Sequence, residues 1–219
     1  MRIYVTKKLG ANINKGMIGL FFEDINYSLD GGLYAEMIEN RSFEFVESTG
    51  QDYTYYQKFA GDYGWTLYPN SNASGSLAIK SDKPMNEVNP NYLEINVREG
   101  NVTFSNKAYD GIFMKKDLAY NISFFAKSEK YVGNIEVLII KDNKVVASSI
   151  IANSLSNEWT KYEGSLISNE DISSGDFVIR LSSSGVVCFD FISMMPSDAV
   201  LGLFRRDLAE LLKNMKPGF

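Results

Sequence analysis

The most informative stretch of the sequence is Met17-Ile-Gly-Leu-Phe-Phe22, which is followed at once by the carboxylate of Glu23. Its side chains are apolar on both faces, as they are in a parallel strand that is covered on both sides. In a barrel of alternating strands and helices, the residues just beyond the carboxyl end of a strand point into the mouth where the chemistry takes place. The stretch therefore predicts a barrel strand with Glu23 in the mouth.

The same stretch opens a longer motif that resembles a known family. The N-terminal signature of the family 51 alpha-L-arabinofuranosidases is closely similar to Phe21-Phe-Glu-Asp-Ile-Asn26 and Asp30-Gly-Gly-Leu-Tyr-Ala-Glu-Met-Ile-Glu-Asn-Arg-Ser-Phe-Glu44. The helix that leads into that family's second barrel strand resembles Phe204-Arg-Arg-Asp-Leu-Ala-Glu-Leu-Leu-Lys-Asn-Met-Lys-Pro-Gly-Phe219. The resemblance implies an N-terminal part of an enzyme that hydrolyses terminal arabinofuranosides in arabinoxylan or arabinan, and so a role in hemicellulose degradation and arabinose metabolism.

Length and composition limit the classes of protein to consider. The 219 residues are 45% hydrophobic and 22% charged, an ordinary balance for one large or two small soluble domains. A net charge of -5 without any block of Lys or Arg gives no basic surface for nucleic acid or an anionic membrane. No apolar run approaches the ~20 residues of a membrane helix, and the first residues lack the apolar core of a signal peptide. We expect a cytoplasmic chain, secreted only if its natural N-terminus is longer, with a neutral glycan as partner.

The chain has one cysteine, Cys188, and no histidine. A disulfide within the chain, the usual catalytic triads and histidine-rich zinc sites are therefore excluded. Cys188 lies in the apolar run Gly185-Val-Val-Cys-Phe-Asp-Phe191, which predicts a buried strand residue. Any acid–base chemistry would rest on carboxylates, tyrosines or lysines.

Short runs rich in β-branched and aromatic residues follow one another between about residues 42 and 196, separated by Gly, Asn, Ser and Asp. This spacing predicts an antiparallel β-sandwich, and its skeleton resembles the family 4 and 9 type carbohydrate-binding modules. The expected fold is mainly β, with a jelly-roll sandwich inserted in the first beta-alpha unit of an incomplete TIM barrel. The best strand candidates are residues 92–97, 121–126, 135–140, 159–166, 177–181 and 186–192.

The flanking segments are predicted to complete the beta-alpha unit. Residues 2–6 suit a short strand, residues 32–41 suit a short helix, and residues 197–219 suit a longer helix that ends at Pro217 and packs on a sheet. Because the final helix comes about 180 residues after the barrel strand, an inserted domain with adjacent ends is the simplest arrangement. The predicted domains are residues 1–41, 42–196 and 197–219.

The resemblance assigns substrate binding, not catalysis, to residues of this chain. It implies that Glu23 bonds arabinose hydroxyls, while Asp24 and Asn26 either contact the sugar or hold the loop. Glu23 could equally be a strand-end carboxylate bonded to nearby backbone. A retaining glycosidase needs two carboxyl groups about 5 Å apart, and the family places both on later barrel strands. We therefore assign no catalytic residue, expect the chain to be inactive alone, and do not transfer catalysis to the pairs Asn86-Glu87, Asn157-Glu158 and Asn169-Glu170.

Aromatic residues crowd into a polar, loop-like stretch and predict a carbohydrate-binding surface. The alternative is that they pack the sandwich against its neighbours. The candidates for carbohydrate binding are Tyr53, Tyr55, Tyr56, Tyr63 and Tyr68. Trp65 and Trp159 are expected in the core instead, at positions where such modules bury an aromatic ring.

No cofactor is required by this interpretation, although such modules often carry a structural calcium ion. Glu44 and Asp190 lie in the regions that would hold it, and the alternative is a hydrogen-bonded pair of strand carboxylates. Two other functions stay open: a freestanding carbohydrate-binding sandwich, and a structural sandwich that mediates oligomer contacts. A homo-oligomer is also expected because an isolated barrel strand has open edges.

Overall fold

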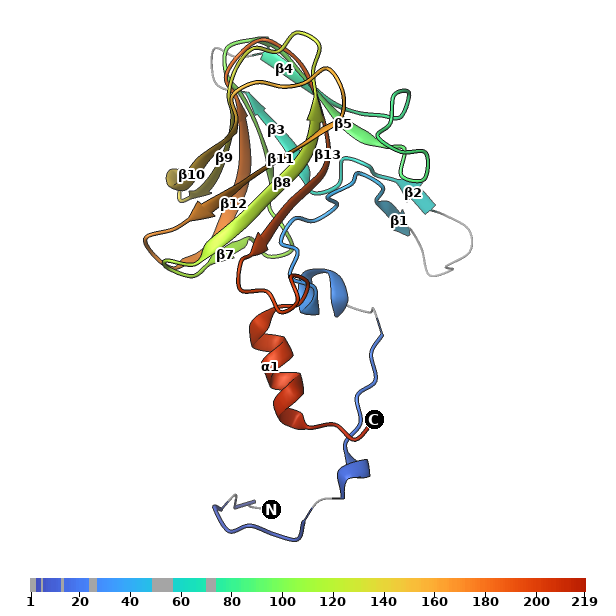
Figure 1. Cartoon of the computed structure of the whole chain (residues 1–219), viewed down its shortest axis with the longest axis vertical. Helices are drawn as coiled ribbons and strands as arrows, with labels where there is room; N and C mark the ends of the chain where they lie inside the picture. The colour runs from blue at the N-terminus through green and yellow to red at the C-terminus, as the bar shows by residue number, and fades with distance from the viewer. Residues whose placement is uncertain (1–2, 5, 13, 24–26, 49–56, 70–73) are drawn as a thin grey trace.

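The computed structural model describes the chain except for residues 1–2, 5, 13, 24–26, 49–56 and 70–73. Two antiparallel sheets packed face to face form most of it (Figure 1). One sheet has the order β10-β9-β12-β6-β3, with β7 beside β12, and the other has the order β11-β8-β13-β5-β4. The strands of the first sheet are β3 (Trp65–Pro69), β6 (Val102–Asn106), β7 (Ile112–Met114), β9 (Ile135–Lys141), β10 (Lys144–Ala152) and β12 (Ile172–Leu181). Those of the second are β4 (Ser74–Lys80), β5 (Tyr92–Glu99), β8 (Ala119–Lys127), β11 (Thr160–Ile167) and β13 (Gly185–Pro196).

The strands form where apolar residues alternate with polar ones. In β5, Leu93, Ile95 and Val97 are buried between the sheets, whereas Glu94 lies on the outer face. A period of two puts alternate side chains on opposite faces, so each sheet contributes one apolar face to a common core. The centre of that core is a set of touching rings, with Phe104 against Trp65 and Phe189, and Phe124 against Phe189.

The predicted sandwich is confirmed, and each of the six strand candidates coincides with an observed strand to within a few residues. Trp65 lies in the core as expected. Two strands that are not among the six candidates, β4 and β10, are only partly buried, so their alternation is weaker. A further short pair, β1 (Val46–Ser48) and β2 (Gln57–Phe59), stands apart from both sheets.

The predicted barrel strand is wrong. Residues 18–23 are extended but form no strand, after the short 3-10 turn η1 (Lys15–Met17). Phe21 is 85% exposed and Phe22 53% exposed. Among the residues that the structure describes, the backbone of this stretch bonds to the C-terminal residues, through Leu20 to Phe219 and Gly218 to Ile18, and the Glu23 carbonyl accepts from the Ser28 hydroxyl. A β-strand requires a neighbouring strand to pair with. The C-terminal residues supply only a short contact, so the apolar composition of this stretch does not produce a strand. The described residues of the predicted strand 2–6 are also outside any strand.

The helix predicted over residues 32–41 is also wrong. A single wide turn, η2 (Leu29–Leu33), contains non-helical backbone at Asp30, Gly31 and Gly32, and residues 34–38 run extended. The reason is tertiary pairing. β13 pairs with β5 only as far as Phe189, and beyond that point Met37 donates to the Met194 carbonyl and Ile192 donates to the Arg41 carbonyl. Residues 34–43, here called the linking segment, therefore take the place that β5 leaves beside β13.

The chain enters and leaves the sandwich at one place. The Ala35 amide donates to the Leu203 carbonyl at 2.7 Å, and the Arg205 amide donates to the Leu33 carbonyl at 2.9 Å. Figure 1 shows the blue and red segments meeting there below the sheets. This is the geometry that an inserted unit needs, and the division of the chain into domains stays a prediction.

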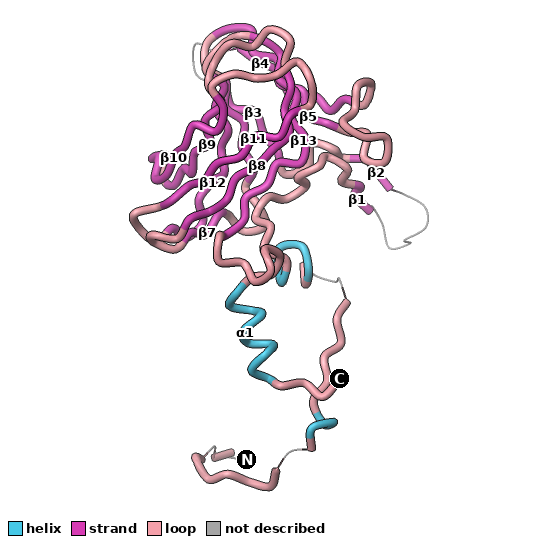
Figure 2. Tube along the Cα trace, viewed as in Figure 1, coloured by secondary structure: helices cyan, strands magenta, loops and turns pink. Residues whose placement is uncertain are grey.

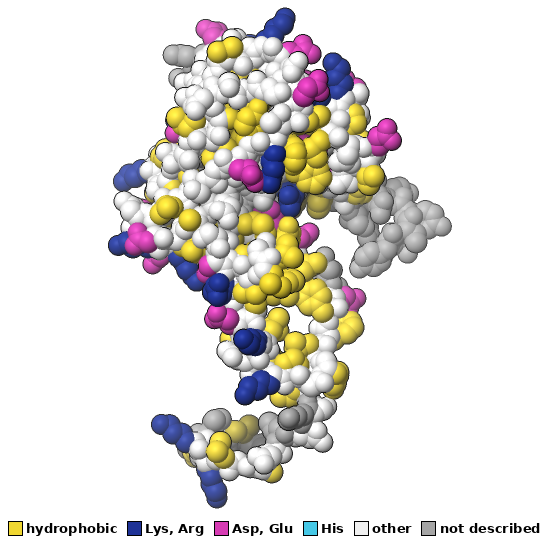
Figure 3. Space-filling model, viewed as in Figure 1, with side chains coloured by type: hydrophobic (Ala, Val, Ile, Leu, Met, Phe, Trp, Pro, Cys, Tyr) yellow, Lys and Arg dark blue, Asp and Glu magenta, His cyan; other side chains and the backbone are white. Residues whose placement is uncertain are grey.

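The helix predicted over residues 197–219 is shorter than expected. Turns occupy residues 197–198 and 201–203, and α1 covers Arg206–Met215 before a left-handed Lys216 and Pro217 end it. It is not packed on a sheet: α1 has no buried residue, and it extends away from the sandwich (Figure 2). Hydrophobic side chains gather on this lower part of the molecule (Figure 3). No described helix is long and apolar enough to cross a membrane.

Replacing Ile38 by Ala should destabilise the chain by about 2–4 kcal/mol, because Ile38 is 1% exposed and belongs to the sandwich core. The matched control is Phe21→Ala in the same sequence motif, which should change stability by less than about 0.5 kcal/mol since Phe21 is exposed. Urea unfolding of the two variants measures both values. Equal effects would contradict the assignment of the linking segment to the core.

Candidate functional site

The residues predicted to bind substrate lie outside the sandwich. Glu23 is exposed at the end of the extended stretch, and the Ser28 hydroxyl donates to its backbone carbonyl oxygen. Asp24 and Asn26 lie outside the described residues. The structure thus places Glu23 where a ligand can reach it, and the sugar-binding roles of all three residues stay predictions.

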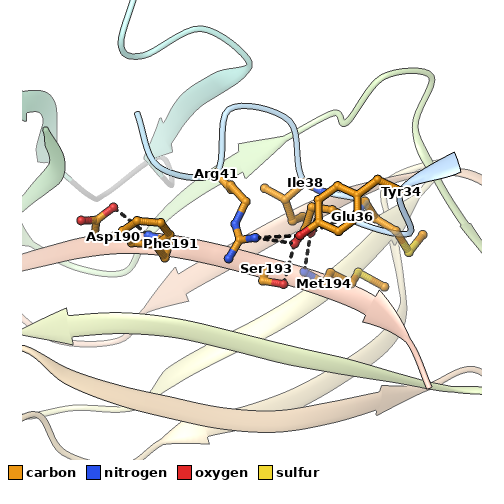
Figure 4. Close-up of polar contacts among 9 residues, drawn as sticks. Tyr34, Glu36, Ile38, Arg41, Asp190, Phe191, Ser193 and Met194 are labelled. Atoms are coloured by element: carbon orange, nitrogen blue, oxygen red, sulfur yellow. Dashed lines mark hydrogen bonds and ion pairs between the residues drawn. The ribbon is translucent and has the colours of Figure 1, made fainter. Parts of the chain in front are cut away.

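Another carboxylate of the same motif, Glu36, is at the centre of a buried polar cluster that the sequence did not single out (Figure 4). Its side chain is 5% exposed. Oε1 accepts from the amides of Met37 at 3.0 Å, Ile38 at 3.1 Å and Met194 at 2.9 Å, and Oε2 accepts from the Ser193 hydroxyl at 2.6 Å. One carboxylate therefore fastens the linking segment to β13.

Arg41 completes this cluster from the other end of the linking segment. Its Nη1 lies 3.5 Å from Glu36 Oε2 and donates to the Tyr34 hydroxyl at 3.1 Å, and its guanidinium stands 5.6 Å from the centre of the Phe191 ring. Burial raises the pKa of Glu36, while the hydrogen bonds from Ser193 and Met194 and the charge of Arg41 act in the opposite direction. Every acceptor position of Glu36 is engaged within the protein, so this carboxyl is structural.

A cavity of about 530 Å³ lies between this cluster, η2 and the start of α1. Gly31 lines it at φ +78°, where a side chain would strike the Tyr109 ring, so only glycine suits the position. Burial raises the pKa of Tyr109. The other polar residues at this cavity include Tyr34, Glu36, Lys115, Tyr120, Asp171, Asp198, Arg205, Arg206 and Asp207. Arg205 and Arg206 are already paired with Asp207 and Asp198.

Of the two carboxylates predicted to hold a metal ion, Glu44 and Asp190, the charge of Glu44 acts on Asp190. Burial and then the Glu44 charge raise the pKa of Asp190 to about 7, against the bond from the Phe191 amide. Asp190 is fully buried, and its Oδ2 has no hydrogen-bond partner among the described residues. Glu44 is held by Asn91, whose amide donates to Oε1 at 2.8 Å and whose side chain donates to Oε2. The described residues contain no group of three or more Cys, Asp or Glu side chains placed to hold a metal ion.

Of the aromatic candidates, only Tyr63 can be placed in full. Its ring stacks on Phe45 at 4.2 Å with an angle of 12° between the planes, and it is 38% exposed. Tyr53, Tyr55 and Tyr56 lie outside the described residues, and Tyr68 belongs to β3. The described part of this candidate surface is thus the stacked pair of Phe45 and Tyr63, which is partly exposed. The binding role of the five tyrosines stays a prediction.

Trp159, expected in the core, lies on the outer face of the second sheet instead. It meets the Tyr92 ring edge-on at 5.4 Å, and its indole N–H donates to the Lys83 carbonyl at 3.2 Å. The expectation failed because Trp159 precedes β11 and packs on the outside of β8. One sequence signal could have pointed there: Tyr92 is the outward member of a strand whose inward residues are all aliphatic.

No protein-family model matches the chain. Several known proteins are nevertheless similar to it over nearly its whole length. An extracellular exo-alpha-L-arabinofuranosidase of Streptomyces chartreusis is 28% identical over 216 residues, which are 96% of this chain and 24% of that protein. Alpha-L-arabinofuranosidase 2 of Arabidopsis thaliana is 26% identical over 226 residues, which are 94% of this chain and 31% of that protein. The arabinose-bound structure of the alpha-L-arabinofuranosidase MgGH51 superposes with a TM-score of 0.76 and 26% identity, covering 96% of this chain and 34% of that one.

These matches make the chain similar over nearly its whole length to glycoside hydrolases. Within that class the chain is similar to alpha-L-arabinofuranosidases, and the solved structure that it matches is one of family 51. It spans about a quarter to a third of the length of these relatives.

Asp190→Asn should flatten the dependence of stability on pH between about pH 4 and pH 7. Folded Asp190 keeps its proton up to a pKa of about 7, whereas an unperturbed carboxyl ionises near 3.8. The folded state therefore binds more protons in this window, and the free energy of unfolding falls as pH rises, by on the order of 4 kcal/mol in total.

Urea unfolding at about pH 4, 6 and 8 measures this slope. The exposed Asp110→Asn is the matched control and should keep the wild-type slope. If Asp190→Asn also kept it, the raised pKa of Asp190 would be refuted.

Proposed function

We propose that the chain is part of an alpha-L-arabinofuranosidase that removes terminal arabinofuranosyl groups from arabinoxylan or arabinan. The observation that carries the proposal is the match of 96% of the chain to the arabinose-bound enzyme structure at a TM-score of 0.76. The exposed position of Glu23 supports a role for it, with Asp24 and Asn26, in binding the sugar.

Within such an enzyme, the sandwich would bind carbohydrate without cleaving it. Retaining hydrolysis needs an acid and a nucleophile about 5 Å apart that both reach the substrate. Three carboxylates beside β13 do not suit this task, because Asp190 is fully buried, Glu44 is held by Asn91 and Glu36 is enclosed by amides. The catalytic carboxylates would belong to parts of the enzyme other than this chain.

The purified chain should bind arabinose-substituted xylo-oligosaccharides and release no arabinose from them. Calorimetric titration measures the binding, and chromatography of the same mixture measures arabinose. Replacing Tyr55, Tyr56 and Tyr63 together by Ala should weaken the affinity about tenfold or more, since aromatic anchors carry much of a binding energy. Phe113→Ala is the control, because Phe113 is 53% exposed elsewhere on the surface.

Release of arabinose would refute the non-cleaving role. Absence of heat with every arabinose- or xylose-containing glycan would refute carbohydrate binding. That second outcome would favour a structural sandwich whose exposed apolar residues, such as Phe21 and Leu211, form oligomer contacts.

We further propose a structural calcium ion between Glu44 and Asp190. The buried, unbonded Oδ2 of Asp190 supports it, and carbonyls or waters would supply the remaining oxygens of the six to eight that calcium takes. The melting temperature should then rise by several degrees in calcium chloride relative to a chelator, and magnesium should not replace calcium.

Asp190→Asn should lose this rise in melting temperature, whereas Asp110→Asn should keep it. No difference between calcium and chelator in the wild-type chain would leave Glu44 and Asp190 as a metal-free carboxylate pair.

A further inference from the structure

A second hollow, of about 720 Å³, lies on the outer face of the second sheet, far along β13 from the Glu36 cluster. Its size is within the range of small-molecule sites. Its floor comes from β5, β8 and β13, and its walls come from the loops before β5, after β8 and before β11. The lining residues used below are Asp82, Lys83, Tyr92, Glu94, Lys127, Trp159 and Cys188.

Strand register sets the two principal charges of the hollow opposite each other. Glu94 of β5 pairs with Cys188 of β13, and Cys188 pairs with Lys127 of β8. Neighbouring strands are about 4.8 Å apart, so the backbones of Glu94 and Lys127 flank Cys188 at a separation of roughly 10 Å. Figure 3 shows charged side chains of both signs beside a hydrophobic group over β5 and β13.

Lys127 is held in position by rings. Its Nζ stands 4.6 Å from the centre of the Trp159 ring and 5.6 Å from that of Tyr92, and it donates to the Lys83 carbonyl at 3.0 Å. An ammonium over two aromatic rings is oriented by their electron-rich faces. In the part of the chain that the structure describes, Lys127 makes no ion pair, so two of its three N–H groups remain for a ligand.

The opposite side of the hollow offers acceptors. Glu94 is half-buried, and within the described ranges its side chain makes neither an ion pair nor a hydrogen bond. The Tyr92 hydroxyl donates to Asp82 Oδ1 at 2.8 Å, which keeps that wall rigid. Cys188 on the floor is an inert surface, since burial raises the pKa of its thiol to about 11.

The charges of the lining nearly cancel, with three lysines facing four acidic residues: Lys83, Lys127 and Lys130 against Asp82, Glu94, Glu129 and Glu158. An anion or a cation would therefore meet as much repulsion as attraction. A neutral polyhydroxylated ligand meets donors on one side, acceptors on the other and apolar ring surface between them, which is the pattern that hydroxyls can satisfy in full.

We propose that this hollow binds a neutral sugar unit of an oligosaccharide, with Lys127 donating to its hydroxyls and Glu94 accepting from them. This deepens the carbohydrate-binding function proposed above and rests on it, and it adds a second set of contacts to those proposed for Tyr55, Tyr56 and Tyr63. Trp159 acts through Lys127 as a positioning residue.

The two tryptophans make the inference directly testable, because Trp65 is in the core and Trp159 is at the hollow. In nuclear magnetic resonance spectra of the ¹⁵N-labelled chain, titration with arabinose-substituted xylotetraose should shift the Trp159 indole signal and leave that of Trp65 in place. Lys127→Met and Glu94→Gln keep the size of the side chains, and each should raise the dissociation constant about tenfold or more.

The matched control is Lys161→Met, since Lys161 is an exposed lysine of the same sheet paired with Glu163. It should bind like the wild-type chain. Binding that persists unchanged in Lys127→Met and Glu94→Gln, without movement of the Trp159 signal, would refute this site while leaving carbohydrate binding intact. Binding confined to a glucuronic-acid-substituted xylo-oligosaccharide would refute the neutral ligand. No binding of any oligosaccharide would refute both the site and the binding function.

Discussion

The arrangement of the chain depends on one buried carboxylate. Glu36 accepts hydrogen bonds from two amides of its own segment and from an amide and a hydroxyl of β13, 157 and 158 residues further along the chain. Burying such a group is costly unless every acceptor is engaged. Because Met194 and Ser193 supply that engagement only when the linking segment lies beside β13, the carboxylate ties the family motif to the sandwich. Arg41 and Tyr34 then gain defined positions around it.

The sandwich could be predicted because its signal is local. Strands such as β5 and β8 alternate inward aliphatic or aromatic residues with outward polar ones, and this pattern needs no knowledge of partners. The barrel strand and the helix of residues 32–41 failed for the opposite reason. Residues 17–22 have the composition of a buried strand, but a strand also requires neighbours. Ala35 and Ile38 have helical spacing, but the free edge of β13 pairs with the backbone of their segment instead.

The candidate sites divide in the same way. Glu44 and Asp190 could be paired from sequence because the resemblance assigns both strands a common region, and the charge of Glu44 contributes to the raised pKa of Asp190. The Glu36 cluster and the hollow beside Trp159 could not, since each joins residues far apart in the chain. Lys127 of β8 contacts Lys83 and Trp159 only after the sheet has formed, because Lys83 lies in the loop before β5 and Trp159 precedes β11. The sequence shows which residue types are present, whereas the strand order determines which of them lie side by side in the Glu36 cluster and the hollow.

The place where the chain enters and leaves the sandwich also has a mechanical consequence. Leu33 and Arg205 are joined by a backbone hydrogen bond, as are Ala35 and Leu203, so tension applied to the segments outside them is carried across this short pairing. The sheets lie outside the path of the load until those bonds break. A pull applied next to this pairing would thus break its two hydrogen bonds before it strained the sheets. The two sheets would carry no load while the hydrogen bonds between residues 33–35 and 203–205 remain intact.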